Sequence, residues 1–185
     1  MQPILKAQCN QSRLVIVDMQ QRLADAMPAN EMKSISRQCG ILLQAAKLLE
    51  IPILYTEHYP KGLGPTIPEL MPQLATTARI EKTAFSCPAE PGFSQHLTSD
   101  RPQIILAGME SHICILQTAL DLHASGRQVF VAEDAVLSRN AANKTNALHR
   151  LRQAGIVVSN TESIVFEWLG KAEGEAFKQI SRLIR

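Results

Sequence analysis

Short, continuously apolar runs alternate along the chain with longer stretches in which apolar residues recur at helical spacing. A continuous apolar run favours a parallel strand buried on both faces, because a half-exposed strand would alternate apolar and polar residues. Six segments have this pattern, and we predict strands at 13–19, 51–57, 78–85, 102–108, 127–134 and 155–160.

Between these runs, apolar residues gather on one face of three predicted helices, at 31–49, 112–125 and 140–154. Gly126 and Gly155 follow the last two, at positions where a left-handed residue often ends a helix. The last stretch, 161–184, predicts two short helices around Gly170. Strand and helix alternating in this order predict an α/β fold with a mostly parallel, helix-covered sheet.

Two segments do not follow this alternation. Segment 58–77 contains four prolines and two glycines, and segment 86–93 is a second proline-containing loop. A connection as long as 58–77 is unusual in a compact domain. We therefore expect it to shape a pocket or a subunit contact. Nothing else suggests a linker or an internal repeat, so we predict a single domain over 1–185.

Composition narrows the classes of function. The net charge is +2, with 19 Lys and Arg against 17 Asp and Glu, and the charges are scattered along the chain. Neither nucleic acid nor an anionic membrane is an expected partner. No apolar run approaches the roughly 18 residues of a membrane span, and no leader-like segment is present. We expect a cytoplasmic protein.

The four cysteines, Cys9, Cys39, Cys87 and Cys114, form no C-x-x-C pair and have no histidines at zinc-ligand spacing. They are typical of reduced thiols rather than of a disulfide framework or a structural zinc site.

Chemistry is most expected at the carboxyl ends of the strands, where parallel α/β sheets bind their ligands. Asp18 ends the first strand, Lys82 ends the third, and the fourth runs into a turn that presents Cys114. If these three strands lie near each other at the sheet centre, a base, a cation and a nucleophile converge. Asp18 would accept the thiol proton, and Lys82 would orient Asp18 and lower the cost of the thiolate.

Each residue also has a simpler interpretation. An aspartate that ends a strand is often a helix cap, a strand-end lysine often faces solvent, and a buried cysteine is usually inert. The position of all three at one sheet edge favours the functional interpretation.

These residues carry a resemblance to a known family. The segments "LVIVDMQ", "EKTAFS" and "LAGMESHICILQTALDL", in this order, resemble the isochorismatase-like cysteine hydrolase superfamily. The segments "TEHYPKGLGPTIPEL" and "VAEDAVLSRN" are most similar to its isochorismatase domain-containing subgroup. The resemblance extends from about residue 10 to residue 183.

The resemblance implies a three-layer, Rossmann-like fold with a six-stranded sheet and a catalytic triad of Asp18, Lys82 and Cys114. It also implies a cis peptide bond between Met109 and Glu110, in a turn that supplies N–H groups to an oxyanion together with Cys114. Family members are dimers or larger, so it implies a homo-oligomer.

Two departures from the family bear on the substrate. True isochorismatases lack the cysteine, so Cys114 points to acyl or related carbonyl chemistry. Nicotinamidases hold a metal with an aspartate and two histidines, whereas the matching stretch here has one histidine, His58, beside Glu57. Three or more protein ligands are usual for such a metal. We therefore expect no metal and no other cofactor.

The favoured hypothesis is a metal-independent hydrolase of a small amide, ureido or ester-like molecule. Two alternatives remain: a catalytically weak family member that acts as an interaction protein, and a nicotinamidase-like amidase. A thiol redox sensor with Cys87 as the partner of Cys114 is a further idea. Residues expected to line the substrate pocket are Gln20, His58, Tyr59, Phe85 and His112.

Overall fold

The computed structural model describes residues 5–184, so residues 1–4 and 185 of the predicted domain lie outside the described part. It contains a six-stranded sheet in the order β3-β2-β1-β4-β5-β6, in which every neighbouring pair is parallel. The strands are β1 (Ser12–Val17), β2 (Ile53–His58), β3 (Ala78–Lys82), β4 (Gln103–Met109), β5 (Gln128–Leu137) and β6 (Val157–Ser159). The predicted α/β fold class is confirmed.

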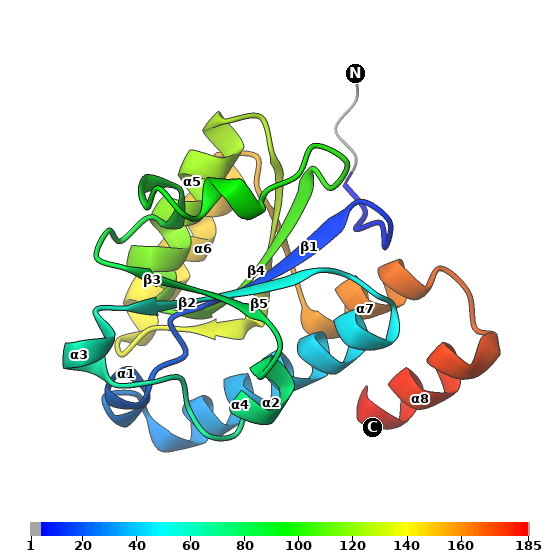
Figure 1. The fold of residues 1–185 in the computed structure, drawn as a ribbon, viewed down its shortest axis with the longest axis horizontal. Coiled ribbons are helices and arrows are strands. Elements are labelled where there is room, and N and C mark those ends of the chain that lie inside the picture. Colours follow the sequence, from blue (N-terminus) through cyan, green and yellow to red (C-terminus); the bar gives the residue numbers. More distant parts are fainter. Residues whose placement is uncertain (1–4, 185) are drawn as a thin grey trace.

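The helices cover both faces of the sheet (Figure 1). One face carries α2 and α7, and the other carries α5 and α6. The larger helices are α2 (Ala29–Leu48), α5 (Leu116–Ala124), α6 (Ala141–Gln153), α7 (Thr161–Leu169) and α8 (Gly174–Ile184). Single or near-single turns are α1 (Gln21–Asp25), α3 (Pro60–Leu63) and α4 (Met71–Leu74).

The central strand β1 is buried on both faces, and its side chains divide between two apolar cores. Leu14 and Ile16 join the core beneath α2 and α7, whereas Val15 and Val17 join the core beneath α5 and α6. This alternation explains why the run is continuously apolar in the sequence.

The expected buried character of the third strand is wrong. β3 is an edge strand in which Ala78, Arg79 and Glu81 are exposed and only Lys82 is buried. It also lies outside the sheet centre, because β2 separates it from β1. An edge strand needs apolar contacts on fewer sides, so its mixed composition is consistent with its place.

The proline-rich segment 58–77 contains the two short helices α3 and α4. Backbone contacts hold it to the rest of the protein. The backbone of Ile67 donates to the carbonyl of Met19, 2.8 Å away, and Gln20 forms an isolated bridge with Thr66. Within residues 5–184, no helix has the length and apolar character needed to cross a membrane.

Candidate active site

The carboxyl ends of β1 and β3 and the turn after β4 bring Asp18, Lys82 and Cys114 together. The Lys82 Nζ lies 2.6 Å from Asp18 Oδ2 and 3.7 Å from Cys114 Sγ. The side chains of Asp18 and Lys82 are fully buried, and Cys114 is 6% exposed. Lys82 therefore reaches past β2 and bridges the carboxylate and the thiol, although β3 is at the sheet edge.

Asp18 leaves β1 in the left-handed region, with φ of 50°. Its backbone N–H donates to the carbonyl of Thr56 on β2, 3.1 Å away, and its Oδ1 accepts from Thr56 Oγ1 at 2.6 Å. With Lys82 on the other carboxylate oxygen, each oxygen of Asp18 has a donor. Thr56 is not among the residues predicted from the sequence, where its only signal is a hydroxyl residue near the end of an apolar run.

Lys82 is surrounded by acceptors. Besides Asp18, its Nζ donates to the carbonyls of Ala84 and Phe85 at 3.2 and 3.4 Å. Burial lowers the pKa of Lys82, but the Asp18 carboxylate and the Cys114 side chain outweigh burial, and the pKa is raised overall. The ammonium therefore stays charged beside Asp18.

His58, at the end of β2, lies against this ammonium, with Nδ1 3.5 Å from the Lys82 Nζ. Burial and the nearby Lys82 charge lower the pKa of His58 below its ordinary value of 6.5, so the ring is neutral at pH 7. The ring stacks on Phe85 at a centroid distance of 5.4 Å, and Phe85 is half exposed. These two predicted pocket residues thus lie together beside Lys82.

Cys114 lies in a π-helical turn, Ser111–Ile115, that leads into α5. Burial, followed by the Asp18 carboxylate, raises the pKa of Cys114 far above its ordinary value, and Lys82 opposes this rise only in part. The sequence predicts that Asp18 accepts the thiol proton and that Lys82 lowers the cost of the thiolate. The raised pKa keeps the resting side chain a neutral thiol at pH 7, so a base must take its proton before the sulfur can attack.

The turn before Cys114 is tied to the segment that follows β5. The peptide bond between Met109 and Glu110 is cis. The Glu110 carboxylate accepts from the backbone N–H of Arg139 at 3.0 Å and pairs with its Nε at 3.3 Å. His112 Nδ1 lies 3.0 Å from Ser138 Oγ, so the imidazole contacts the β5 segment. Glu110 and His112 thus connect the turn that carries Cys114 to the neighbouring strand end.

Gly108 allows β4 to approach β1 just before this turn. Its φ is +121°, and a Cβ at this position would lie 2.0 Å from the carbonyl oxygen of Val17. Since Val17 precedes Asp18, this contact sets the distance between the strand that supplies the carboxylate and the strand that leads to the thiol.

Gln20 and Tyr59 occupy different surroundings. The Gln20 side chain is buried and bonds the N–H and the carbonyl of His58 and the carbonyl of Gly64, so it holds the start of the proline-rich segment. Tyr59 is 55% exposed and lines a pocket of about 290 Å³. Lys82 lines the same pocket. Tyr59 therefore lies in a pocket that borders Lys82, whose side chain is buried, whereas Gln20 fixes the loop that carries Tyr59.

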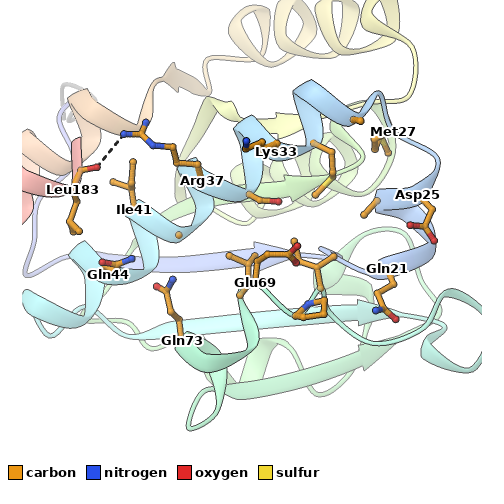
Figure 2. Close-up of a pocket in the computed structure, with 18 residues that line it drawn as sticks. Gln21, Asp25, Met27, Lys33, Arg37, Ile41, Gln44, Glu69, Gln73 and Leu183 are labelled. Atoms are coloured by element: carbon orange, nitrogen blue, oxygen red, sulfur yellow. Dashed lines mark hydrogen bonds between the residues drawn. The ribbon is translucent and has the colours of Figure 1, made fainter. Parts of the chain in front are cut away.

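A larger cavity, of about 990 Å³, lies between α2 and the 67–73 segment. Figure 2 shows polar side chains of both elements, among them Gln44 and Gln73, directed into it, with Leu183 of α8 at one end. None of Asp18, Lys82 and Cys114 lines this cavity. The volume of a cavity alone therefore does not identify the candidate active site.

The structure gives little support to metal binding beside His58. The buried Glu57 carboxylate accepts from the Thr66 N–H and hydroxyl at 2.7 and 2.8 Å and pairs with Arg79 at 3.1 Å. Across residues 5–184, no group of three or more His, Cys, Asp or Glu side chains comes together in a way that could hold a metal ion.

Cys87 is fully buried in the same apolar core as Cys114. Its N–H donates to Thr118 Oγ1 at 2.9 Å. Burial, then the Asp18 carboxylate, raises the pKa of Cys87 to about 11, against smaller opposing effects of Lys82 and of hydrogen bonds with Thr118 and Thr56. A buried, protonated thiol is a poor nucleophile, which weighs against Cys87 as a redox partner.

Comparisons with known proteins extend this description. The isochorismatase domain matches residues 12–163. Isochorismatase domain-containing protein 2 from Bos taurus is 40% identical over 177 residues, which cover 94% of this chain and 83% of the relative.

Two solved structures share the fold. One is the MAR1 ribonuclease from Caenorhabditis elegans, with a TM-score of 0.88 and 35% identity over 97% of this chain and 92% of that one. The other is the YcaC gene product from Escherichia coli, described as an octameric hydrolase of unknown specificity. It has a TM-score of 0.88 and 22% identity over 99% and 92% of the two chains.

Proposed function

Because the chain belongs to the isochorismatase family of hydrolases, we propose that it is a metal-independent cysteine hydrolase of small amide, ureido or ester-like molecules. The observation that carries this proposal is the buried Lys82 ammonium, 2.6 Å from the Asp18 carboxylate and 3.7 Å from the Cys114 sulfur. In this proposal Asp18 is the base, the Lys82 ammonium compensates the charge of the carboxylate, and Cys114 is the nucleophile.

In the first step, Asp18 accepts the thiol proton of Cys114 as the sulfur attacks the carbonyl carbon of the substrate. The Lys82 ammonium pairs with Asp18 Oδ2 at 2.6 Å and orients the carboxylate for this transfer. The carbonyl oxygen becomes an oxyanion, for which we propose the N–H groups of Cys114 and of the Met109–Glu110 turn as donors.

In the second step, the tetrahedral intermediate collapses and the bond to the leaving nitrogen or oxygen breaks. Asp18 returns its proton to the leaving group, and an acyl group remains on Cys114. Water, deprotonated by Asp18, then attacks the thioester, and the acid product leaves as the proton returns to the sulfur. The need for a base fits the raised pKa of the Cys114 thiol.

RNA is a weaker candidate substrate, although one structural relative is named a ribonuclease. The net charge of this chain is +2, and the lining of the pocket beside Lys82 includes Glu81 and Glu90 as well as Lys61. An RNA-binding surface would be expected to carry a basic stripe.

A substrate screen tests the proposal. Small amides, ureido compounds and activated esters, with a single-stranded RNA as a further arm, are incubated with the wild type and with Cys114→Ala. We expect hydrolysis of at least one small molecule by the wild type, loss of that activity in Cys114→Ala, and intact RNA. Hydrolysis that survives in Cys114→Ala, or an absence of turnover across the panel, would count against a cysteine hydrolase.

We also propose a homo-oligomer. The support is the description of the YcaC relative as an octamer.

A further inference from the structure

The Asp18 carboxylate has two close donors, and only one of them belongs to the proposed triad. Lys82 donates to Oδ2 at 2.6 Å, and Thr56 Oγ1 donates to Oδ1 at the same distance. Thr56 also accepts from the Asp18 backbone N–H through its carbonyl oxygen, at 3.1 Å. One residue of β2 thus holds both the main chain and the side chain of the candidate base.

Thr56 is well placed to act on the carboxylate without touching the substrate. It lies on β2, the strand between β1 and β3, and is 1% exposed. Its partner Asp18 is fully buried. The Thr56 side chain also bonds with the Cys87 side chain, as does Thr118, so an effect that Thr56→Val has and Thr118→Val lacks would pass through Asp18.

The Thr56 hydroxyl has a role that the backbone hydrogen bond between Asp18 and Thr56 cannot fill. A buried carboxylate needs a donor at each oxygen, because solvent cannot replace a missing one. With Thr56 on one oxygen and Lys82 on the other, the plane of the carboxylate is fixed. Hydrogen bonds to an ionised oxygen are short and strong, so this orientation is well defined.

We propose that Thr56 is a positioning residue, whose hydroxyl sets the orientation in which Asp18 takes the proton from Cys114. This proposal rests on the function proposed above, since it assumes that Asp18 is the base. It predicts that removal of the hydroxyl slows proton transfer while the fold and the apolar packing remain.

The chain offers a matched control in Thr118 of α5. Like Thr56, Thr118 is buried, and its hydroxyl accepts a hydrogen bond, from the Cys87 N–H. The structure gives Thr118 no bond to Asp18, Lys82 or Cys114. Replacing it with valine therefore causes a similar loss of a buried hydroxyl close to the site without a direct effect on the carboxylate.

The test uses acrylamide, an amide that reacts with a thiol without hydrolysis. The Cys114 sulfur forms a bond to the β-carbon of acrylamide, the thiol proton passes to Asp18, and the α-carbon receives a proton, so that no leaving group is needed. Intact-mass spectrometry follows the adduct over time in the wild type, Thr56→Val, Thr56→Ser and Thr118→Val, and Cys114→Ala identifies the reacting residue.

We expect Thr56→Val to slow adduct formation about 10-fold or more, a part of the 10²–10⁴-fold that a positioned base contributes. Thr56→Ser keeps the hydroxyl and should react at a rate within about 3-fold of the wild type, as should Thr118→Val. With any substrate found in the screen, Thr56→Val should lower kcat and leave KM unchanged, because Thr56 does not contact the substrate.

Two results would overturn the proposal: equal rates for Thr56→Val and the wild type, or an equal slowing in Thr118→Val. If Thr56→Val does not fold, Thr56→Ala replaces it in the comparison with Thr56→Ser. A wild type that forms the adduct on Cys114 but hydrolyses nothing would contradict the hydrolase proposal alone. A wild-type Cys114 that forms no adduct would count against both.

Discussion

Lys82 and Asp18 form an ion pair whose two side chains are fully buried, which is a costly arrangement unless each charge has its partner. The pair is surrounded by further polar contacts, from Thr56 on the carboxylate and from the Ala84 and Phe85 carbonyls on the ammonium. At the scale of single residues, the site is a compensated charge pair placed beside a neutral thiol.

Removing one member of this pair should destabilise the protein strongly. Lys82→Met keeps an apolar stem but leaves the Asp18 carboxylate buried without its cation, and we expect a loss of about 3–5 kcal/mol in the free energy of unfolding. Lys47→Met, at an exposed position on α2, should change it by less than about 0.5 kcal/mol. Urea unfolding at pH 7 measures both. A loss below about 1 kcal/mol for Lys82→Met would contradict the burial of this pair.

The Cys114 thiol should respond to pH in a specific way. Burial and Asp18 raise its pKa above the ordinary 9.0, so the reactive thiolate fraction is small at pH 7 and grows as pH rises. The ultraviolet absorbance of the Cys114 thiolate, taken as the difference between the wild type and Cys114→Ala, should therefore still be increasing at pH 9. A plateau reached near pH 7 would indicate a thiolate in the resting protein and would contradict the electrostatics of the site.

Strand-end residues that carry a charge or a thiol could be found from the sequence. Site residues with an ordinary strand-forming side chain could not. Asp18, Lys82 and Cys114 stood out because each interrupts or follows an apolar run, and the structure brings them together. Thr56 did not stand out, because threonine is common in strands and its role depends on the neighbour that β1 supplies. The raised pKa of the Cys114 thiol could not be predicted either, since burial cannot be read from the turn sequence alone.

At the scale of elements, β1 and β4 position the site because they pair side by side up to Val17 and Gly108, just before Asp18 and the turn that carries Cys114. Gly108 makes this pairing possible. The strand and helix order followed from hydrophobic periodicity, and the helix predicted at 112–125 is present as a π-helical turn continued by α5. The place of β3 at the edge could not be predicted, because strand order depends on how the crossovers pack rather than on the strand's own residues.

Gly108 should tolerate no side chain. In Gly108→Ala, the new Cβ would meet the Val17 carbonyl oxygen at 2.0 Å and would also require a positive φ. We expect destabilisation of about 4 kcal/mol or more. Gly126→Ala is a matched control, since its φ is also positive but no atom lies within 4 Å of a Cβ there. It should cost about 1 kcal/mol. Equal losses in thermal or urea unfolding would contradict the close approach of β4 to β1.

At the scale of the whole molecule, the sheet separates two apolar cores and gathers the polar residues at one edge. Fold class and family could be predicted from the sequence, because periodicity and three ordered motifs extend over most of the chain. Substrate and assembly could not be predicted, because they depend on loops and exposed surfaces, whose shape no periodicity describes.

Assembly should be visible in the mass of the protein in solution. If the chain forms the proposed homo-oligomer, light scattering after size exclusion should give an integer multiple, of two or more, of the 20.4 kDa chain mass. A mass of one chain at micromolar concentration would contradict the proposal.

The proposed mechanism requires Cys114 to carry the acyl group of the substrate during hydrolysis. The most direct measurement is intact-mass and peptide mass spectrometry of the protein quenched in acid during turnover of a substrate from the screen. We expect a mass increase equal to the acyl portion of the substrate, located on the peptide that contains Cys114 and absent from Cys114→Ala. Turnover without any adduct on Cys114, together with activity that persists in Cys114→Ala, would contradict the account.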